Sequence, residues 1–357
     1  MKIALIMYQM GAGGAERVMS ILANYWANHG HDVSLITWSS EESFYPLDPK
    51  VKQVKLGLAS DSSNPIQAIL SNYQRVKALR SALKQLIPDG VISFLPMNNI
   101  RAIMAASPLG IPVVVSERND PHLDRLGRPW EWLRNKTYPR AKSVVIQTDS
   151  AGTYFNDEIR ERMVTIPNPV LPPEHRRPPN PGSKRIIAVG RLVEQKGFDL
   201  LMRAFAPVSA KHPDWKLLIF GEGELRPKLE QLRAELKLEN SVELPGSTKQ
   251  IGAEMAASDV FVLSSRFEGF PNVLCEAMAV GLPVVSFACP SGPSEIITDG
   301  VDGLLVSAED VDGLTMAIRR MISSDELREK IASKAPQIVE RLGVEQVARL
   351  WEAQLGL

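Results

Sequence analysis

The hydrophobic pattern of the chain consists of two series of short apolar runs, each run followed by a polar or glycine-rich turn. In the first half it predicts strands at 2–8, 32–37, 90–95, 112–116 and 143–147, and helices over 14–29 and 66–87. In the second half it predicts strands at 185–189, 216–220, 241–244, 259–263 and 283–287. Short apolar strands that alternate with helices are typical of parallel α/β sheets. The pattern therefore predicts two doubly wound, Rossmann-like α/β domains that face each other across a cleft.

A proline-rich segment separates the two series. Residues 166–184 contain seven prolines, and proline fixes φ and removes a backbone donor, so regular structure is not expected there. We predict an N-terminal domain over 1–170, a linker over 171–184 and a C-terminal domain over 185–334. The last segment, 335–357, is predicted to hold a helix over about 335–355 that packs back onto the N-terminal domain.

Composition narrows the class of protein. A chain of 357 residues with 44% hydrophobic residues can fill two cores, and its net charge of zero argues against a polyanion-binding protein. Residues 75–142 nevertheless hold 12 basic and 5 acidic residues. The only cysteines are Cys275 and Cys289, which favours a reducing compartment. No run of 18 apolar residues and no signal peptide is found, so we expect a cytoplasmic protein, with peripheral membrane contact left open.

The segment 267–276 carries two glutamates at the junction of a turn and a helix. It follows a predicted buried strand, Gly269 permits a tight turn, and Pro271 suits the first helical position. Glu268 in the turn and Glu276 inside the helix can each accept hydrogen bonds from sugar or ribose hydroxyls. The backbone N–H groups of Gly269, Phe270 and Asn272 would open the helix and attract an anion. The alternative is a pair of surface glutamates on an amphipathic helix.

Two further turns follow the first two strands of the second series. The turn after 185–189 begins at Gly190 and carries Arg191 and Lys196, two cations that suit a leaving diphosphate. A solvated basic turn is the alternative. The turn after 216–220 holds Gly221 and Glu222, where glycine allows a base or a ribose to approach the backbone.

The first domain offers two polar turns. Gly13 and Gly14 follow the first strand and open a helix, an arrangement that suits an anion or serves only as a tight turn. A dinucleotide fingerprint would need a third glycine where Glu16 stands, which argues against a dehydrogenase. The loop at 116–122 offers Glu117, Arg118 and Asp120 to the cleft, or is simply a polar loop.

Metal ligation and membrane contact have weaker signals. Asp310 and Asp312 resemble a D-x-D metal motif, but they precede a helix and are expected to cap it. No Cys/His ligand spacing is present. In the helix 66–87, Lys77, Arg80 and Lys84 form a basic stripe that is either solvated or contacts anionic lipid or an acceptor diphosphate. Its apolar face is predicted to comprise Ile66, Ile69, Tyr73, Val76, Leu83 and Ile87.

Read in order, these segments resemble the retaining glycosyltransferases of family 4, which have the GT-B fold. The resemblance covers nearly the whole chain and is carried by the following motifs: Gly-Gly-Ala-Glu-Arg at 13–17, Ser-Glu-Arg-Asn-Asp-Pro at 116–121, Ile-Pro-Asn-Pro-Val at 166–170, Gly-Arg-Leu with Lys-Gly at 190–197, Gly-Glu-Gly at 221–223, and Phe-Glu-Gly-Phe-Pro-Asn at 267–272. It is strongest for enzymes that extend lipid-diphosphate-linked or other bacterial surface glycans. The resemblance implies a UDP-sugar donor, a glycan acceptor and the transfer of N-acetylgalactosamine or a related hexose. It also implies that no metal cofactor is needed.

The resemblance also implies roles for individual residues. Arg191 and Lys196 would hold the nucleotide diphosphate, Glu268 would contact the donor sugar, and Glu276 would hold the ribose. Gly13 and Gly14 would line the donor phosphate and the acceptor side. Arg118 stands where family members often carry histidine. The alternatives are a sugar-nucleotide epimerase of the same architecture, a dehydrogenase and a non-catalytic carbohydrate-binding protein.

Overall fold

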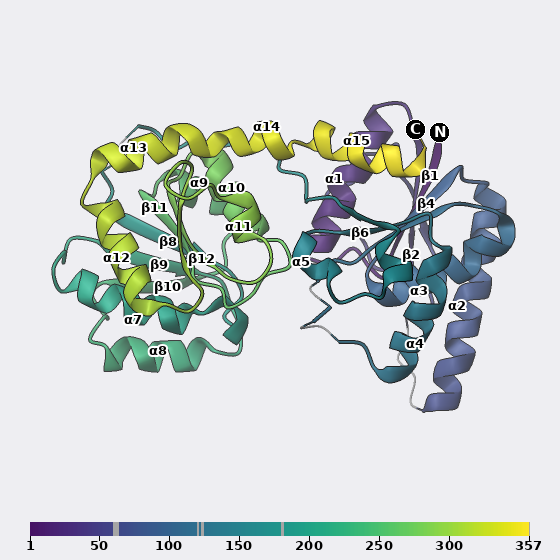
Figure 1. The fold of residues 1–357 in the computed structure, drawn as a ribbon, viewed down its shortest axis with the longest axis horizontal. Coiled ribbons are helices and arrows are strands. Elements are labelled where there is room, and N and C mark those ends of the chain that lie inside the picture. The colour runs from purple at the N-terminus through teal and green to yellow at the C-terminus, as the bar shows by residue number, and fades with distance from the viewer. Residues whose placement is uncertain (60–63, 120, 123–124, 180–181, 357) are drawn as a thin grey trace. The chain divides into compact units, whose positions relative to one another are not determined.

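The computed structural model describes residues 1–59, 64–119, 121–122, 125–179 and 182–356. They form two compact units, one of residues 1–169 and 344–357 and the other of residues 170–343. Each unit has one parallel β-sheet with helices packed against it (Figure 1). The prediction of two doubly wound α/β domains is confirmed. Among these residues, no helix combines the length and the apolar character needed to cross a bilayer.

The first unit contains a seven-stranded sheet in the order β3-β2-β1-β4-β5-β6-β7. Its strands are β1 (Lys2–Met7), β2 (Asp32–Thr37), β3 (Lys52–Lys55), β4 (Gly90–Phe94), β5 (Val113–Ser116), β6 (Ser143–Ile146) and β7 (Met163–Thr165). Its helices are α1 (Gly14–Asn28), α2 (Pro65–Leu86), α3 (Pro96–Ala106), α4 (Arg128–Thr137), α5 (Asp149–Gly152), α6 (Asp157–Arg160) and α15 (Val344–Leu355). The strand order reverses between β1 and β4, so the turns after these strands lie at the ligand-binding edge of such a sheet.

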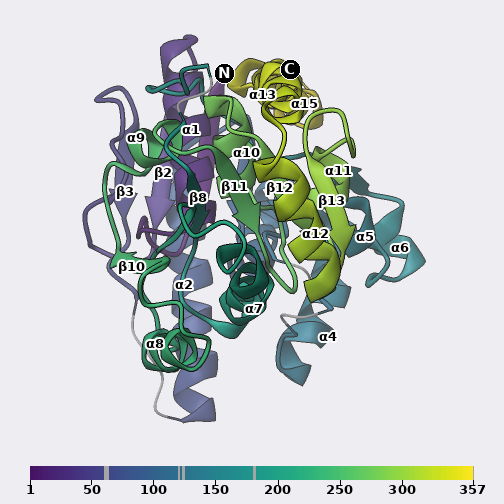
Figure 2. The same cartoon turned by 90° about the vertical axis from the view of Figure 1, so that its left-hand side faces the viewer.

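The second unit contains a six-stranded sheet in the order β10-β9-β8-β11-β12-β13 (Figure 2). Its strands are β8 (Arg185–Val189), β9 (Lys216–Phe220), β10 (Val242–Gly246), β11 (Val260–Leu263), β12 (Val284–Ala288) and β13 (Leu304–Ser307). Its helices are α7 (Phe198–Ser209), α8 (Arg226–Glu235), α9 (Ile251–Ala256), α10 (Asn272–Val280), α11 (Pro293–Ile296), α12 (Val311–Ile322), α13 (Asp325–Lys334) and α14 (Ile338–Leu342). Here the order reverses between β8 and β11.

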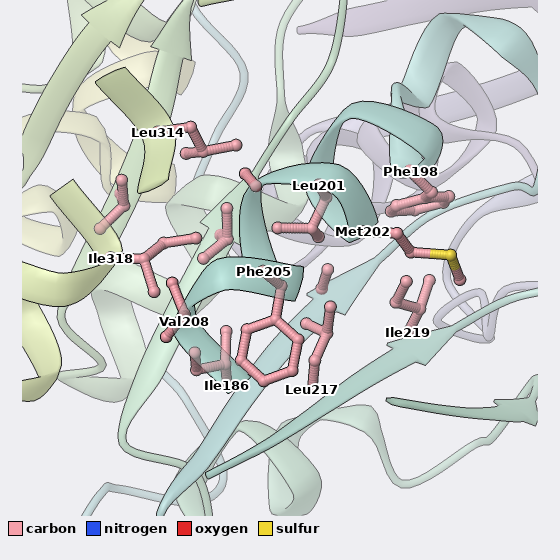
Figure 3. Packing of buried hydrophobic residues seen from close by; sticks show 14 of the residues in the cluster. Ile186, Phe198, Leu201, Met202, Phe205, Val208, Leu217, Ile219, Leu314 and Ile318 are labelled. Carbon is pink, nitrogen blue, oxygen red and sulfur yellow. The ribbon is translucent and has the colours of Figure 1, made fainter. Parts of the chain in front are cut away.

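The apolar strand runs are buried on both faces of each sheet. In the second unit, Phe205 and Leu201 of α7 pack over Ile186 of β8 and Leu217 of β9, beside Leu314 of α12 (Figure 3). Burying side chains of this size contributes about 1.5–3 kcal/mol each. This packing fixes β8 and β11 within the sheet and thereby fixes the turns that follow them.

The C-terminal segment departs from the predicted single helix over 335–355. A short 3₁₀ turn (Ala335–Gln337) and α14 are followed by Gly343 and then by α15. The helix breaks there because Gly343 is extended, with φ −62° and ψ 157°, and forms a bridge with Val170. α15 packs against α1 in the first unit. The predicted linker residue Arg177 donates its backbone N–H to Val280 in the second unit.

Candidate active site

The turn after β8 packs closely on the turn after β9. Gly221 has φ +143°, and a Cβ atom there would lie 1.8 Å from the carbonyl oxygen of Gly190. A Cβ atom on Gly190 would lie 3.2 Å from the aliphatic chain of Lys196. Glycine at 190 and 221 therefore serves close packing between turns, and the chain of Lys196 lies over the backbone of Gly190.

Lys196 and Glu268 form an ion pair at the carboxyl ends of β8 and β11. Lys196 Nζ lies 2.6 Å from Glu268 Oε1, and the Ser265 hydroxyl donates to the same oxygen at 2.6 Å. Glu268 is only 5% exposed. A charge-assisted hydrogen bond of this kind fixes both side chains. The structure thus brings together two of the three predicted catalytic residues, 72 positions apart in the sequence.

Arg191, the third predicted catalytic residue, lies on the same turn and is exposed to solvent. Within the part of the chain that the structure describes, its side chain makes no hydrogen bond or ion pair. Its guanidinium is therefore available to fork onto an anion such as phosphate.

Arg266 joins the two turns and was not singled out from the sequence. Its backbone N–H donates to the Gln195 carbonyl at 2.8 Å, and its Nη1 donates to the Glu194 carbonyl at 2.8 Å. Its guanidinium also forms a two-pronged pair with Asp199 on α7, at 2.9 and 2.8 Å. Hydrogen bonding to Asp199 raises the pKa of Arg266. The turn that carries Lys196 is consequently tied to the turn that carries Glu268.

The start of α10 differs from the prediction in two ways. Pro271 occupies the N-cap position, with φ −79° and ψ 78°, so the helix begins one residue later at Asn272. The backbone N–H of Asn272 donates to the Phe270 carbonyl at 2.9 Å and is not free for a ligand. No hydrogen bond from the N–H groups of Gly269 and Phe270 is found among the described residues, so these two donors remain available.

The two other acidic candidates of this unit have different surroundings. Glu276 is half-buried on α10, in the second turn of the helix. Glu222 is exposed and paired with Arg226, with Nε–Oε2 and Nη2–Oε1 distances of 2.7 Å. Hydrogen bonding to Arg226 lowers the pKa of Glu222. The sequence prediction for Glu222 did not foresee this local pair, which engages both carboxylate oxygens.

Gly13 and Gly14 lie at the start of α1 in the first unit. Gly13 occupies the N-cap position, and no side-chain hydrogen bond caps the helix there. Glu16 folds back over this turn, because a Cβ atom on Gly13 would lie 2.1 Å from its carboxylate. Burial raises the pKa of Glu16, while its own backbone N–H and the positive charge of Arg118 oppose that rise. The predicted anion site at this helix start therefore already has a carboxylate over it.

Arg118 is 6% exposed, and its guanidinium lies 4.3 Å from the ring centroid of Phe94. It donates to Asn168 and, at 3.4 Å, to the Ser116 hydroxyl, while its buried Nε has no partner. Burial lowers the pKa of Arg118 to about 9, so it is charged at neutral pH. Among the described residues, no carboxylate lies within ion-pair distance of it. A buried charge with so little compensation is costly.

The remaining residues of this loop are structural or undescribed. Glu117 accepts a hydrogen bond from the buried Tyr138 hydroxyl, and Arg134 lies 3.8 Å away. Glu117 is therefore part of a buried network behind Arg118. Asp120 lies outside the described residues.

The predicted basic stripe of α2 is divided. Lys77 and Lys84 are exposed, whereas Arg80 is half-buried and donates to the carbonyls of Met104 and Ala105 at the end of α3. The predicted apolar face is wrong in part, because Ile66, Ile69, Tyr73 and Ile87 are exposed and only Val76 and Leu83 of the named set are buried.

The D-x-D segment and the cysteines have structural roles. The Asp310 side chain accepts a hydrogen bond from the Gly313 N–H at 2.9 Å and caps α12, as predicted. Both cysteines are buried, and burial raises the pKa of each thiol, that of Cys289 to about 12. A buried thiol with a raised pKa is unreactive.

Two parallel sheets with polar turns at their switch points have the GT-B architecture, and comparison with known proteins shows which family of this architecture the chain belongs to. Residues 173–338 match the family described as "Glycosyl transferases group 1", and residues 12–172 match "Glycosyltransferase Family 4". The chain belongs to these glycosyltransferases.

Three known proteins illustrate the similarity. The chain is 29% identical to the amylovoran biosynthesis glycosyltransferase AmsD of Erwinia amylovora, over 95% of each chain. It is 28% identical to a Campylobacter jejuni transferase that adds α-1,4-N-acetyl-D-galactosamine to a GalNAc-GalNAc-diNAcBac-PP-undecaprenol, over 98% of this chain and 97% of that one. Anabaena HepE, solved in complex with UDP, has a TM-score of 0.81 and 19% identity over 100% of both chains.

Proposed function

We propose that the protein transfers a hexosyl or N-acetylhexosaminyl group from a UDP-sugar to a glycan acceptor linked to a lipid diphosphate, with retention of anomeric configuration. The observation that carries this proposal is the Lys196–Glu268 pair, held at 2.6 Å beside the exposed Arg191. Together, Arg191, Lys196 and Glu268 place two cations and one oriented carboxylate on the turns after β8 and β11. Such a set suits a sugar joined to a diphosphate.

On the donor side, Arg191 and Lys196 hold the diphosphate and stabilise the negative charge that grows as it leaves. Glu268 accepts from hydroxyls of the transferred sugar, and the backbone N–H groups of Gly269 and Phe270 assist. Glu276 accepts from the ribose hydroxyls. Before the donor binds, Lys196 and Glu268 neutralise each other's charge. When the donor binds, its diphosphate also contacts Lys196 and its sugar hydroxyls also contact Glu268.

The chemical step exchanges one bond for another at the anomeric carbon. The bond from this carbon to the diphosphate oxygen breaks with both electrons, and the acceptor hydroxyl oxygen forms the new bond on the same face. The proton of that hydroxyl passes to the departing phosphate oxygen. No metal ion takes part, so chelation with EDTA is expected to leave the rate unchanged.

On the acceptor side, Arg118 contacts the acceptor or the sugar 6-position. Gly13 and Gly14 line the acceptor, because the Glu16 carboxylate over their turn disfavours the donor phosphate there. The UDP donor is supported by the UDP complex of the HepE structure. The lipid-diphosphate acceptor is supported by the Campylobacter relative, whose acceptor is an undecaprenol diphosphate glycan. Such an acceptor would bring the reaction to the cytoplasmic face of the membrane, with Lys77 and Lys84 near the lipid.

The test is a panel of nucleotide sugars scored by nucleotide release, with and without polyprenyl-diphosphate glycans. We expect acceptor-dependent release of UDP and an α-linked product, with the linkage read by NMR. Conversion of the donor alone to an epimer would indicate an epimerase. A change in nicotinamide absorbance would indicate a dehydrogenase, and binding without release a carbohydrate-binding protein.

A further inference from the structure

Arg101 is a buried arginine of the first unit whose guanidinium is only partly hydrogen-bonded. It lies in the second turn of α3 and is 4% exposed. Its Nε donates to the side-chain oxygen of Asn72 on α2 at 2.9 Å. Within the part of the chain that the structure describes, Nη1 and Nη2 make no hydrogen bond, and both still reach the surface. The guanidinium is therefore fixed through one nitrogen, with the other two open to a ligand.

Two indole rings lie beside this guanidinium. Its central carbon is 5.8 Å from the ring centroid of Trp38 and 5.1 Å from that of Trp130. Trp38 is fully buried, and its Nε1 donates to Asn98 in the first turn of α3. Trp130, on α4, is half-buried. Aromatic rings attract a cation, but they do not replace the hydrogen-bond acceptors that its N–H groups require.

Other buried arginines of this protein have carboxylate partners. Arg134 pairs with Glu131 at 2.6 Å. Arg328, which also lies beside an indole ring, donates to Asp325 and to two backbone carbonyls at 2.9 Å. No carboxylate among the described residues lies within ion-pair distance of Arg101. The comparison shows that the protein normally compensates a buried guanidinium and does not do so at Arg101.

A second cation makes the surroundings of Arg101 more positive. Arg75 on α2 is 7% exposed, and its charge adds to burial in lowering the pKa of Arg101 to about 10. Arg101 is therefore charged at neutral pH. A buried cation beside another cation is costly, and a bound anion would offset that cost.

The open guanidinium lies at the ligand-binding edge of the first sheet. Trp38 follows β2, and its backbone N–H donates to the carbonyl of Tyr8, which follows β1. Helix α3 begins directly after β4. The strand order reverses between β1 and β4, and ligands bind at such a switch point.

The open nitrogens of Arg101 match a carboxylate best. A carboxylate is planar and accepts two parallel hydrogen bonds from one guanidinium. Its single negative charge balances the one uncompensated cation, whereas a diphosphate carries more charge than this cation offsets. The half-buried ring of Trp130 adds an apolar surface against which the C–H face of a sugar can pack.

We propose that Arg101 binds the carboxylate of a uronic acid in the acceptor glycan, with Trp130 packed against the same sugar. The proposal rests on the proposed function, which assigns the first unit to the acceptor. It adds the substrate class, an acidic glycan.

The first experiment measures binding to the full chain by saturation-transfer NMR, without nucleotide sugar. The probes are the methyl glycosides of glucuronic and galacturonic acid, their uncharged methyl esters, and inorganic pyrophosphate. We expect at least one uronide to bind, and its ester to bind at least about tenfold more weakly because the charge-assisted hydrogen bonds are lost. Pyrophosphate should not displace the uronide. The ester comparison uses the unaltered chain, so it does not depend on the folding of any variant.

Variants test the residue itself. Arg101→Met keeps an apolar chain beside the indoles and should weaken uronide binding at least about tenfold, with an unchanged or higher thermal midpoint. Arg101→Lys should recover only part of the binding, because an ammonium cannot form two parallel hydrogen bonds. Arg328→Met is the matched control. It should keep uronide binding and lower the thermal midpoint, since it removes a compensated guanidinium.

The transfer assay distinguishes this proposal from the proposed function. An acceptor that carries a uronic acid should have a KM at least about tenfold lower than its methyl ester, and Arg101→Met should remove that difference with kcat retained. Equal KM values with continuing transfer would overturn the acidic acceptor alone. Absence of transfer together with Arg101-dependent uronide binding would overturn sugar transfer alone.

Three binding outcomes would also overturn the proposal. Failure of both uronides to bind would exclude the carboxylate site. Displacement of the uronide by pyrophosphate would assign the site to a diphosphate. Unchanged uronide binding in Arg101→Met, with a thermal midpoint lowered as far as in Arg328→Met, would make Arg101 a structural residue.

Discussion

At the scale of single residues, one carboxylate oxygen organises the candidate site. Glu268 Oε1 accepts from both Lys196 Nζ and the Ser265 hydroxyl, each at 2.6 Å. The pair is mostly buried, so removing one partner leaves the other poorly compensated. Lys196 thus has a role in the unliganded protein as well as the proposed role toward diphosphate, and an experiment must separate the two.

Lys196→Ala is expected to lower kcat at saturating donor by about 10²–10³-fold, which corresponds to about 2.7–4 kcal/mol, because the lost cation acts mainly on the charge that grows in the transition state. Steady-state nucleotide release at saturating donor measures this. Lys184→Ala, which removes an exposed lysine paired with Asp214, is the control and should keep normal turnover. Unchanged turnover in Lys196→Ala would refute the assigned role.

Arg118 allows stability and function to be separated. Arg118→Met keeps an apolar chain against Phe94 and removes a buried charge that has no carboxylate partner among the described residues. We expect an unchanged or higher thermal midpoint, because burying the guanidinium is costly. We expect kcat/KM to fall about 10- to 100-fold, the size of a lost charge-assisted hydrogen bond. Lower stability with normal activity would show that Arg118 is structural.

At the scale of elements, the sequence predicted ten of the thirteen described strands to within about two residues, because buried parallel strands are nearly continuous apolar runs. It missed β3, β7 and β13, which lie at sheet edges and are less buried. It failed where a local pattern has two interpretations. Ile66, Ile69 and Tyr73 have the spacing of a core face, and only the packing of α2 on α3 shows which face is buried. The contacts of Arg266 were also beyond prediction, since two run to backbone carbonyls and the others to Asp199, 67 positions away, which no local pattern reveals.

Arg266 is expected to position the two turns rather than contact substrate. Arg266→Ala removes the ion pair with Asp199 and the hydrogen bond to the Glu194 carbonyl. The turns that carry Lys196 and Glu268 are then no longer held in a fixed relative position by this side chain. A misplacement of about 1 Å costs on the order of 100-fold in rate. We therefore expect weaker UDP binding and a kcat about 10- to 100-fold lower, measured by calorimetric titration and nucleotide release.

Two variants make this test specific. Arg185→Ala breaks a comparable pair with Glu254, 2.6 Å apart, at the opposite end of β8, and should keep UDP binding and turnover. Arg266→Lys should restore only part of the activity, because an ammonium cannot reproduce the two-pronged contact with Asp199. A drop in thermal midpoint with normal UDP affinity and kcat would reduce Arg266 to a structural residue.

At the scale of the whole molecule, the chain passes between its two units twice, after residue 169 and again after residue 343. The last helix completes a core that the first 169 residues cannot fill alone. Trp351, Val347 and Leu355 of α15 belong to the core cluster of the first unit, and Trp26 Nε1 donates to Glu352 at 3.0 Å. The stability of the first unit therefore depends on residues that are translated after the whole of the second unit.

Trp351→Ala is expected to destabilise the first unit alone. Its ring is fully buried, with its centroid 5.5 Å from that of Phe94, and truncation of a buried tryptophan costs about 3–5 kcal/mol. Hydrogen exchange read by mass spectrometry should accelerate in β1 and β4 and remain unchanged in β8 and β9. Trp215→Ala, in the core of the second unit, should give the reverse pattern. Equal acceleration in both units for either variant would mean that they unfold as one cooperative body, because a local cavity acts directly only on the core that contains it.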